Sequence, residues 1–114
     1  MLAVIFELEP QAGKQSEYLN EASFLSPLLN EIEGFISVER FESLSTPGKL
    51  LSLSFWKDEE SIRVWRTKEA HREAQYRGRQ AIFADYRLRV ASVVRDYGMD
   101  SRQQVPLDSQ CVHG

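Results

Sequence analysis

The apolar side chains of this chain change their spacing from every second residue to every third or fourth, and back again. Val4, Phe6 and Leu8 alternate with other side chains, which is typical of a strand, here over residues 2–9. Spacings of four and three residues then run through 14–32 and indicate one face of a helix. The predicted elements are a strand over 2–9, a helix over 14–32, strands over 35–43 and 50–56, helical segments beginning at Glu59 and after Thr67, and a strand over 86–97.

Residues with special backbone preferences predict where the helices begin and end. Pro27 lies inside the first helix, and Ser26 before it is suited to capping a new helical start. We therefore expect that helix to be kinked or in two pieces. Gly34 is predicted to stop it, and Asp58 is predicted to cap the next helix.

The last three predicted strands carry further local signals. Pro47 and Gly48 have strong turn chemistry, so the strands on either side of them are expected to form an antiparallel hairpin. In the final strand, Val93 is out of step with the alternation that precedes it. A bulge is therefore predicted near Ala91 and Ser92.

This order of elements predicts a ferredoxin-like α+β domain, β-α-β-β-α-β, with a four-stranded antiparallel sheet and both helices on one face. The opposite face of such a sheet needs cover. The first strand carries apolar groups on both faces, Val4 and Phe6 against Ala3 and Ile5, so we predict a homodimer formed through the sheet face. Residues 1–97 are predicted to form the domain. The polar segment 98–114 is predicted to be a tail that is irregular or packed on the partner subunit.

Length, charge and cysteine content exclude several classes of protein. The chain has 114 residues, a net charge of −3 and one cysteine, Cys111. That length predicts a single domain, and the acidic balance argues against a nucleic-acid partner. One cysteine forms neither an internal disulfide nor a thiolate cage, so we expect no metal and a cytoplasmic location. The longest apolar run, 1–6, is far shorter than the roughly 20 residues of a membrane span, so no membrane partner is expected.

Three parts of the sequence resemble the antibiotic biosynthesis monooxygenase family. They are residues 34–41 (GFISVERF), residues 53–59 (LSFWKDE), and Trp65 with His71 six residues later. The resemblance covers about residues 2–97. It implies a dimeric α+β barrel of ferredoxin-like subunits. Members of this family oxidise polycyclic aromatic substrates without a metal or a flavin, others degrade haem, and many have no known substrate.

The haem-degrading branch of the family has three marker residues, of which this chain matches one. That branch uses an asparagine on the first strand, a helical tryptophan, and a histidine ten residues after it. Trp65 fits the tryptophan, but Gln75 stands at the histidine position, and the first strand offers Phe6 or Glu7. The resemblance therefore argues against haem degradation.

The quinone-forming branch pairs its tryptophan with an asparagine four residues before and a tyrosine six residues after. Here those positions hold Ser61 and His71, and Arg87 lies about where that branch has an arginine. Each of these side chains can hydrogen-bond a phenol or a peroxide. Neither Ser61 nor His71 is the residue of that branch. The resemblance to the family as a whole implies a small cofactor-independent monooxygenase acting on an aromatic or quinone-like molecule.

In that function His71 is the expected base, because its ordinary pKa suits neutral pH, and Trp65 is the platform for a flat ring. Arg40 or Arg87 is expected to hold the substrate anion. Each residue also has a structural alternative, since a lone helical histidine is often structural and a buried tryptophan is often core. The predicted substrate-binding residues are Arg40, Ser61, Gln75, Tyr76, Phe83 and Arg87.

Two other functions remain open from the sequence. The first is a non-enzymatic small-ligand or stress-response module that keeps the fold without the chemistry, and the second is haem binding. The arginines at 63, 66, 72, 77 and 79 alternate with glutamates, which indicates a solvated helical face of mixed charge. The sequence does not identify the substrate, because fold alone does not determine function.

Overall fold

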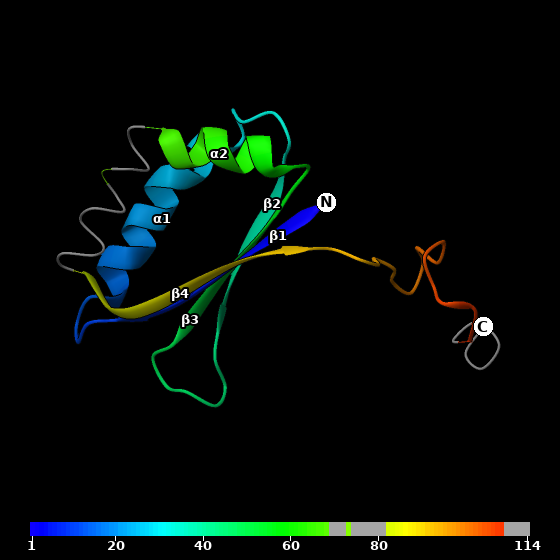
Figure 1. The fold of residues 1–114 in the computed structure, drawn as a ribbon. Helices are drawn as coiled ribbons and strands as arrows, with labels where there is room; N and C mark the ends of the chain where they lie inside the picture. Colours follow the sequence, from blue (N-terminus) through cyan, green and yellow to red (C-terminus); the bar gives the residue numbers. More distant parts are fainter. Residues whose placement is uncertain (69–72, 74–81, 109–114) are drawn as a thin grey trace.

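A computed structural model describes residues 1–68, 73 and 82–108 of the chain. Its elements follow the predicted strand and helix order (Figure 1). They are β1 (Leu2–Pro10), α1 (Gln15–Leu29), β2 (Phe35–Glu42), β3 (Leu50–Trp56), α2 (Glu59–Thr67) and β4 (Phe83–Ser92).

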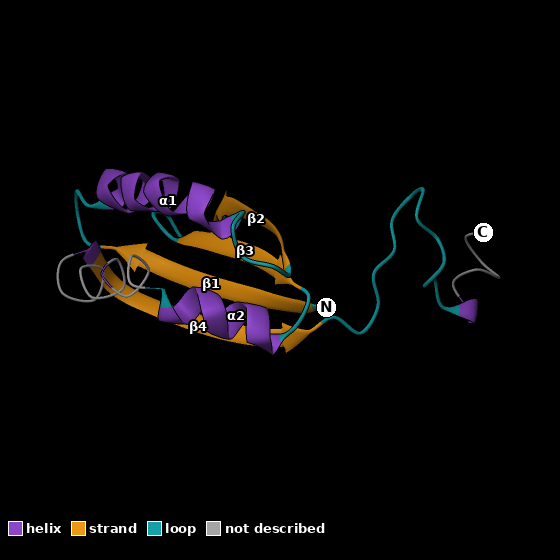
Figure 2. Ribbon diagram, turned by 90° about the horizontal axis from the view of Figure 1, so that it is seen from above, coloured by secondary structure: helices purple, strands orange, loops and turns teal. Residues whose placement is uncertain are grey.

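The four strands form one sheet in the order β2-β3-β1-β4. Every neighbouring pair is antiparallel. In the centre of the sheet, Phe6 of β1 lies opposite Ser52 of β3 and Leu88 of β4. Viewed from above, both helices lie over the sheet (Figure 2). The predicted ferredoxin-like α+β fold is therefore confirmed.

Two clusters of buried side chains hold the helices to the sheet. One consists of Leu8, Tyr18, Leu50 and Ile82, and the other of Leu29, Ile32, Trp56 and Trp65. Strand β3 supplies one residue at each of its ends, Leu50 to the first cluster and Trp56 to the second. The core is thus divided along the length of the sheet.

Helix α1 is continuous through Pro27, so the prediction of a two-piece helix is wrong. Ser26 does not cap a new start, because its hydroxyl donates a hydrogen bond back to the Ala22 carbonyl at 3.0 Å. Pro27 lies in the last turn of the helix, which ends two residues later at Leu29. A proline there removes one backbone hydrogen bond, to the carbonyl four residues earlier, and the helix nevertheless continues to Leu29. Gly34 does not directly follow the helix but ends the turn before β2, with a φ of 94°.

Strand β4 begins and ends earlier than the sequence predicted. It starts at Phe83 because Phe83 pairs with Pro10 at the end of β1, and it stops at Ser92 because β1 begins at Leu2. The Val93 N–H still donates to the Met1 carbonyl at 3.0 Å. The register shift lies between Glu9 and Pro10, so the predicted bulge near Ala91 and Ser92 is wrong.

The remaining local signals behave as expected. Asp58 caps α2, since its Oδ1 accepts hydrogen bonds from the Ser61 N–H at 2.9 Å and from the Ser61 hydroxyl at 2.7 Å. Strands β2 and β3 form the predicted hairpin, with Gly48 in its loop at a φ of 83°. The helical segment predicted after Thr67 lies almost entirely outside the described residues.

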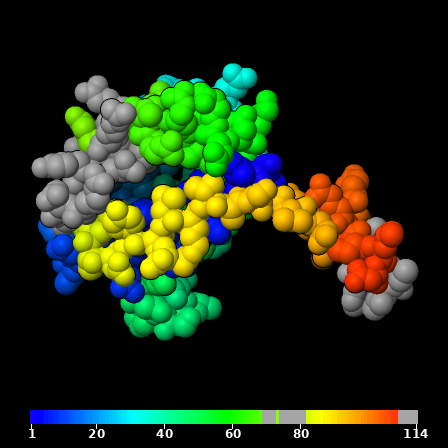
Figure 3. All heavy atoms as spheres, viewed as in Figure 1, coloured from blue at the N-terminus to red at the C-terminus, as the bar shows by residue number. Residues whose placement is uncertain are grey.

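After β4 the chain leaves the sheet and extends away from the domain (Figures 1 and 3). Several apolar side chains of this segment are exposed, among them Val94, Met99 and Leu107, whereas Val105 is buried. That the tail packs on a partner subunit stays a prediction. Within the described part of the chain, no helix is long and apolar enough to cross a membrane.

Candidate functional site

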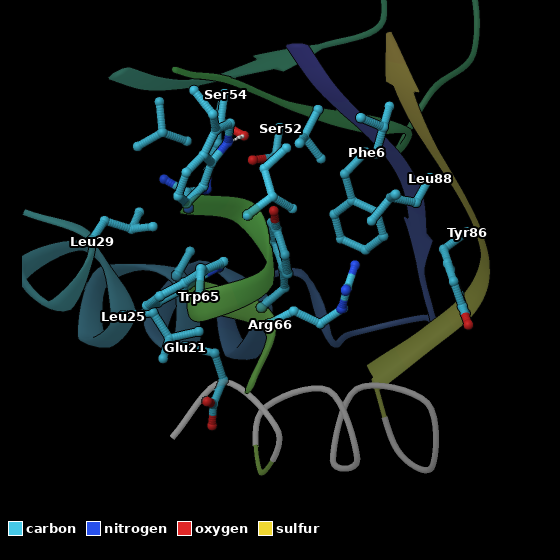
Figure 4. A pocket seen from close by; sticks show the side chains of 18 of the residues that line it. Phe6, Glu21, Leu25, Leu29, Ser52, Ser54, Trp65, Arg66, Tyr86 and Leu88 are labelled. Carbon is cyan, nitrogen blue, oxygen red and sulfur yellow. Dashed lines mark hydrogen bonds between the residues drawn. The ribbon is translucent and has the colours of Figure 1, made fainter. Parts of the chain in front are cut away.

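A cavity of about 260 Å³ lies between the sheet and the two helices (Figure 4). All four strands and both helices contribute to its walls. The side chains that line it are Val4, Phe6, Tyr18, Glu21, Ala22, Leu25, Leu29, Val38, Arg40, Ser52, Ser54, Trp56, Ile62, Trp65, Arg66, Ile82, Phe83, Tyr86, Leu88 and Val90.

The cavity exists because β3 places two small side chains between the two core clusters. On its helix-facing side β3 carries Leu50, Ser52, Ser54 and Trp56 in turn. The outer two fill the clusters, whereas the two serines leave space above the sheet. A serine side chain is much smaller than the leucine or valine that usually fills such a position, so the gap remains open instead of being packed.

Aromatic rings close one end of the cavity. Phe6 packs edge-on against Phe83 and Tyr86, with ring centroids 5.6 and 5.8 Å apart, and Tyr18 lies 6.0 Å from Phe83. Such tilted contacts are favourable for aromatic pairs. The predicted pocket residue Phe83 therefore does line the cavity.

The two tryptophans lie at the other end. Trp65, which is 9% exposed, belongs to a core cluster and also faces the cavity. It therefore serves as core and as cavity wall at once. Trp56 is almost completely buried, and its Nε1–H donates to the Ser54 hydroxyl at 2.8 Å. This bond satisfies the indole and fixes the orientation of Ser54 at the cavity floor.

Two arginines give the cavity its positive charge. Arg40 comes from β2 and is half-buried, and its Nε is enclosed without a hydrogen-bond acceptor among the described residues. Arg66 comes from α2 and reaches toward Phe6 and Tyr86 (Figure 4). Arg66 is exposed, as predicted for a solvated helical face, but it also lines the cavity. Arg63, whose guanidinium pairs with Glu60 on the outside of α2, does fit that description.

Two predicted site residues lie away from the cavity. Ser61 is 5% exposed, and its hydroxyl is engaged with Asp58 at the start of α2. Arg87 is exposed on β4 and lies opposite Glu7 of β1. Its neighbours Tyr86 and Leu88 line the cavity, so strand alternation places Arg87 on the opposite face of the sheet. Neither residue is in position to contact a molecule inside the cavity.

Other predicted residues lie outside the part of the chain that the structure describes. They are His71, Gln75 and Tyr76. Among the described residues, no group of three or more histidine, cysteine, aspartate or glutamate side chains is arranged to hold a metal ion.

The sequence analysis did not single out several residues that line the cavity, notably Tyr18, Ser52, Ser54 and Arg66. A signal for the serines is present in the sequence. They alternate with leucines on a strand that is buried at both ends, so the helix-facing side of β3 is polar at its centre. No such signal distinguishes Arg66 from its basic neighbours on α2.

Charged groups elsewhere stabilise the scaffold. Glu7, on the open face of the sheet, lies 3.4 Å from Lys49 and 3.5 Å from Arg89. The hydrogen bond and charge of Lys49, followed by the charge of Arg89, lower the pKa of Glu7. The pKa of Asp58 is lowered mainly by its hydrogen bonds from Ser61. That of Glu60 is lowered by its bond from Arg63.

Comparison with known proteins identifies relatives by sequence. Residues 1–77 match the family described as "Antibiotic biosynthesis monooxygenase". The chain is 50% identical over 93 residues to a protein of Pyricularia oryzae named "Jasmonate monooxygenase ABM"; the match covers 82% of this chain but only 43% of that protein. It is also 29% identical over 93 residues to the uncharacterised protein YqjZ of Bacillus subtilis, covering 79% of it.

Solved structures share the fold at low sequence identity. A protein described as a putative antibiotic biosynthesis monooxygenase from Deinococcus radiodurans has a TM-score of 0.75 at 13% identity, covering 87% of this chain and 98% of that one. Rv0793 from Mycobacterium tuberculosis also has a TM-score of 0.75 at 13% identity, covering 85% and 98%.

Proposed function

Since this chain belongs to the antibiotic biosynthesis monooxygenase family, we propose that it is a small cofactor-independent monooxygenase. Its substrate would be an aromatic or quinone-like molecule held in the cavity between sheet and helices. The observation that carries the proposal is the cavity itself, largely apolar with Trp65 in its wall and two arginines at its edge. An apolar lining of this kind favours a flat organic molecule. On the β4 side, Tyr86, Leu88 and Val90 remain partly exposed to solvent.

Oxygenation of this kind asks three things of the protein. The protein has to remove a proton from the substrate, stabilise the resulting anion and exclude water. We assign the base to His71, which lies outside the described residues, and the stacking surface to Trp65. Of the two predicted anion holders, Arg40 lines the cavity, whereas Arg87 lies on the opposite face, so the proposal uses Arg40.

The reaction balances with molecular oxygen as the oxidant. For a phenolic substrate with an activated methylene carbon, loss of a proton gives an electron-rich anion that passes electrons to oxygen. The carbon loses two hydrogens and gains one oxygen atom as a carbonyl, and the second oxygen atom leaves as water. The substrate is oxidised by four electrons and oxygen is reduced by four, so the substrate itself is the reductant.

The name of the fungal relative makes jasmonate a second candidate substrate. Half of the aligned residues are identical. The chain spans less than half the length of that relative, so we extend the substrate to this chain only as a proposal. A ligand-binding module without turnover, and a haem-binding protein, are the competing functions.

Oxygen consumption tests the proposal. We expect uptake of oxygen with an anthrone or a hydroquinone, and a rate that falls in His71→Ala. With jasmonate the measurement is binding, because its hydroxylation requires an added two-electron reductant. A rate equal to that of wild type would remove His71 from the mechanism. Binding of the anthrone or the hydroquinone without oxygen uptake would establish the non-enzymatic alternative, and a tight, shifted Soret band on titration with haemin would favour haem.

We also propose that the chain forms a homodimer through the open face of its sheet. Strand alternation places Ile5, Leu51, Leu53 and Phe55 on the face opposite the cavity, and no described element covers them. Burying such a face removes apolar area from water. The ion-paired Glu7 lies on the same face, so the interface would include a polar centre.

A further inference from the structure

The cavity contains a cation without a matching anion. The Nε of Arg40 is enclosed and has no hydrogen-bond acceptor among the described residues. The same part of the chain contains no ion-pair partner for this guanidinium. A buried N–H without an acceptor costs free energy, although Arg40 as a whole is only half-buried. An acceptor brought by a ligand would remove that cost.

A second donor lies beside Arg40. Ser52 is its cross-strand partner in the β2–β3 register, and both side chains line the cavity. Directly paired side chains on one face of an antiparallel sheet are close enough to contact the same group. No described residue bonds the Ser52 hydroxyl. Arg40 and Ser52 therefore form one polar position, which we call the floor pair, beneath an apolar space.

The other walls restrict what kind of anion fits. Above the floor pair the cavity is lined mainly by aliphatic and aromatic side chains from β1, β4 and the helices. The acidic lining residue Glu21 lies on the far side from Ser52 (Figure 4), and Arg66 adds a second positive charge. A carboxylate on an apolar body matches both parts.

We propose that the cavity takes an apolar molecule that ends in a carboxylate, with Arg40 and Ser52 binding the carboxylate. This inference rests on the proposed function, because it assumes that the cavity is the substrate site. It gives Arg40 a carboxylate of the substrate to bind, in place of the anion formed during the reaction, and so adds the acid group to the substrate class. Arg40 sets specificity: it selects the acid over a neutral molecule of the same shape. The apolar body of the ligand then extends toward the aromatic end of the cavity.

A pair of ligands that differ only in charge tests the inference. Naphthylacetate and its methyl ester are titrated at neutral pH into the wild-type chain by calorimetry, with quenching of the cavity tryptophans as a second readout. We expect the acid to bind roughly ten- to a hundredfold more tightly than the ester, the range expected for hydrogen bonds to a charged group.

Substitution of Arg40 tests whether this residue causes the preference for the acid over the ester. Arg40→Met keeps the apolar stem and removes the guanidinium, so the acid should lose its advantage while the ester binds as before. Arg63→Met, which removes an arginine from the outside of α2, is the matched control and should leave both affinities unchanged. A variant that no longer binds the ester is recognised as misfolded, because ester binding requires an intact cavity. In that case Arg40→Lys and Ser52→Ala replace it, and each should lose part of the affinity for the acid.

The possible failures are distinguishable. Equal binding of acid and ester by the wild type, or an acid preference that survives in Arg40→Met, overturns the carboxylate assignment and leaves the cavity as the ligand site. Binding of neither compound counts against the cavity as a ligand site, and so against the proposed function as well.

Discussion

Gly34 lies directly against Ser61, so strand β2 begins at the first turn of helix α2. A methyl group built on Gly34 would overlap the Ser61 hydroxyl. The Gly34 carbonyl also accepts a hydrogen bond from the Lys57 N–H at 2.7 Å. Because Ser61 is held by Asp58, it cannot move aside freely. This contact helps to set where α2 lies over the sheet, and thereby where Trp65 meets the cavity.

Substitution of Gly34 should therefore be costly. Gly34→Ala introduces a side chain at a φ of 94° and into the Ser61 hydroxyl, and we expect the free energy of unfolding to fall by more than about 1 kcal/mol. Urea denaturation measures this. Gly48→Ala is the control, because Gly48 has a φ of 83° but open space around it. Equal losses in the two variants would show that the contact with Ser61 contributes nothing.

The serines of β3 should differ in their effect on stability although they share a face. Ser54→Ala leaves the buried Nε1–H of Trp56 without its acceptor, which is expected to cost about 1–3 kcal/mol. Ser52→Ala breaks no hydrogen bond within the described residues and should change stability far less. The midpoints of urea denaturation compare the two, and a loss in Ser52→Ala as large as that in Ser54→Ala would contradict the assignment.

A charge on the open sheet face should separate the proposed dimer. Leu53→Glu places a carboxylate among Ile5, Leu51 and Phe55, where burial of an unpaired charge is unfavourable. We expect the mass measured by light scattering to fall from two chains to one. Val64→Glu, on the partly exposed side of α2, should leave the mass unchanged. A wild-type chain that is already monomeric at micromolar concentration would refute the dimer.

Acid should destabilise the protein through Asp58. The hydrogen bonds from Ser61 lower the pKa of this carboxyl in the folded state below its usual 3.8. A lowered folded-state pKa contributes stability above the unfolded-state value, and this contribution is lost as the pH falls through the folded-state value. We expect Asp58→Asn, which preserves a capping side chain, to reduce the dependence of the melting temperature on pH in this acidic range.

A tail variant controls for the loss of one negative charge. Asp100→Asn lies in the segment after β4, away from the sheet. It should leave the acid dependence of the melting temperature close to that of wild type. If both variants flatten the curve equally, the net charge of the chain and not the cap of α2 accounts for the effect.

Local signals were sufficient for most of the fold. The alternation in β1 and β3, the cap at Asp58 and the hairpin turn at Gly48 depend on neighbouring residues only. Where the predicted bounds of β4 were wrong, a distant partner decided the outcome. Strand β4 ends at Ser92 because β1 offers it no further partner.

The site was only partly accessible from the sequence. Arg40, Trp65 and Phe83 were predicted and do line the cavity, since their residue types already suggested a role. Ser61 and Arg87 were predicted through resemblance to the family, and the structure places them at a helix cap and on the opposite face of the sheet. Arg66 was missed because its neighbours on α2 are equally basic.

The sequence by itself determined the order of strands and helices, because the spacing of apolar residues is a local property that each segment carries alone. It also determined that β1 carries apolar side chains on both of its faces. Only the tertiary structure decided that a cavity lies over Ser52 and Ser54 and that the Nε of Arg40 is buried there without a hydrogen-bond acceptor among the described residues. These features arise where side chains from four strands and two helices meet, and no single segment contains that information.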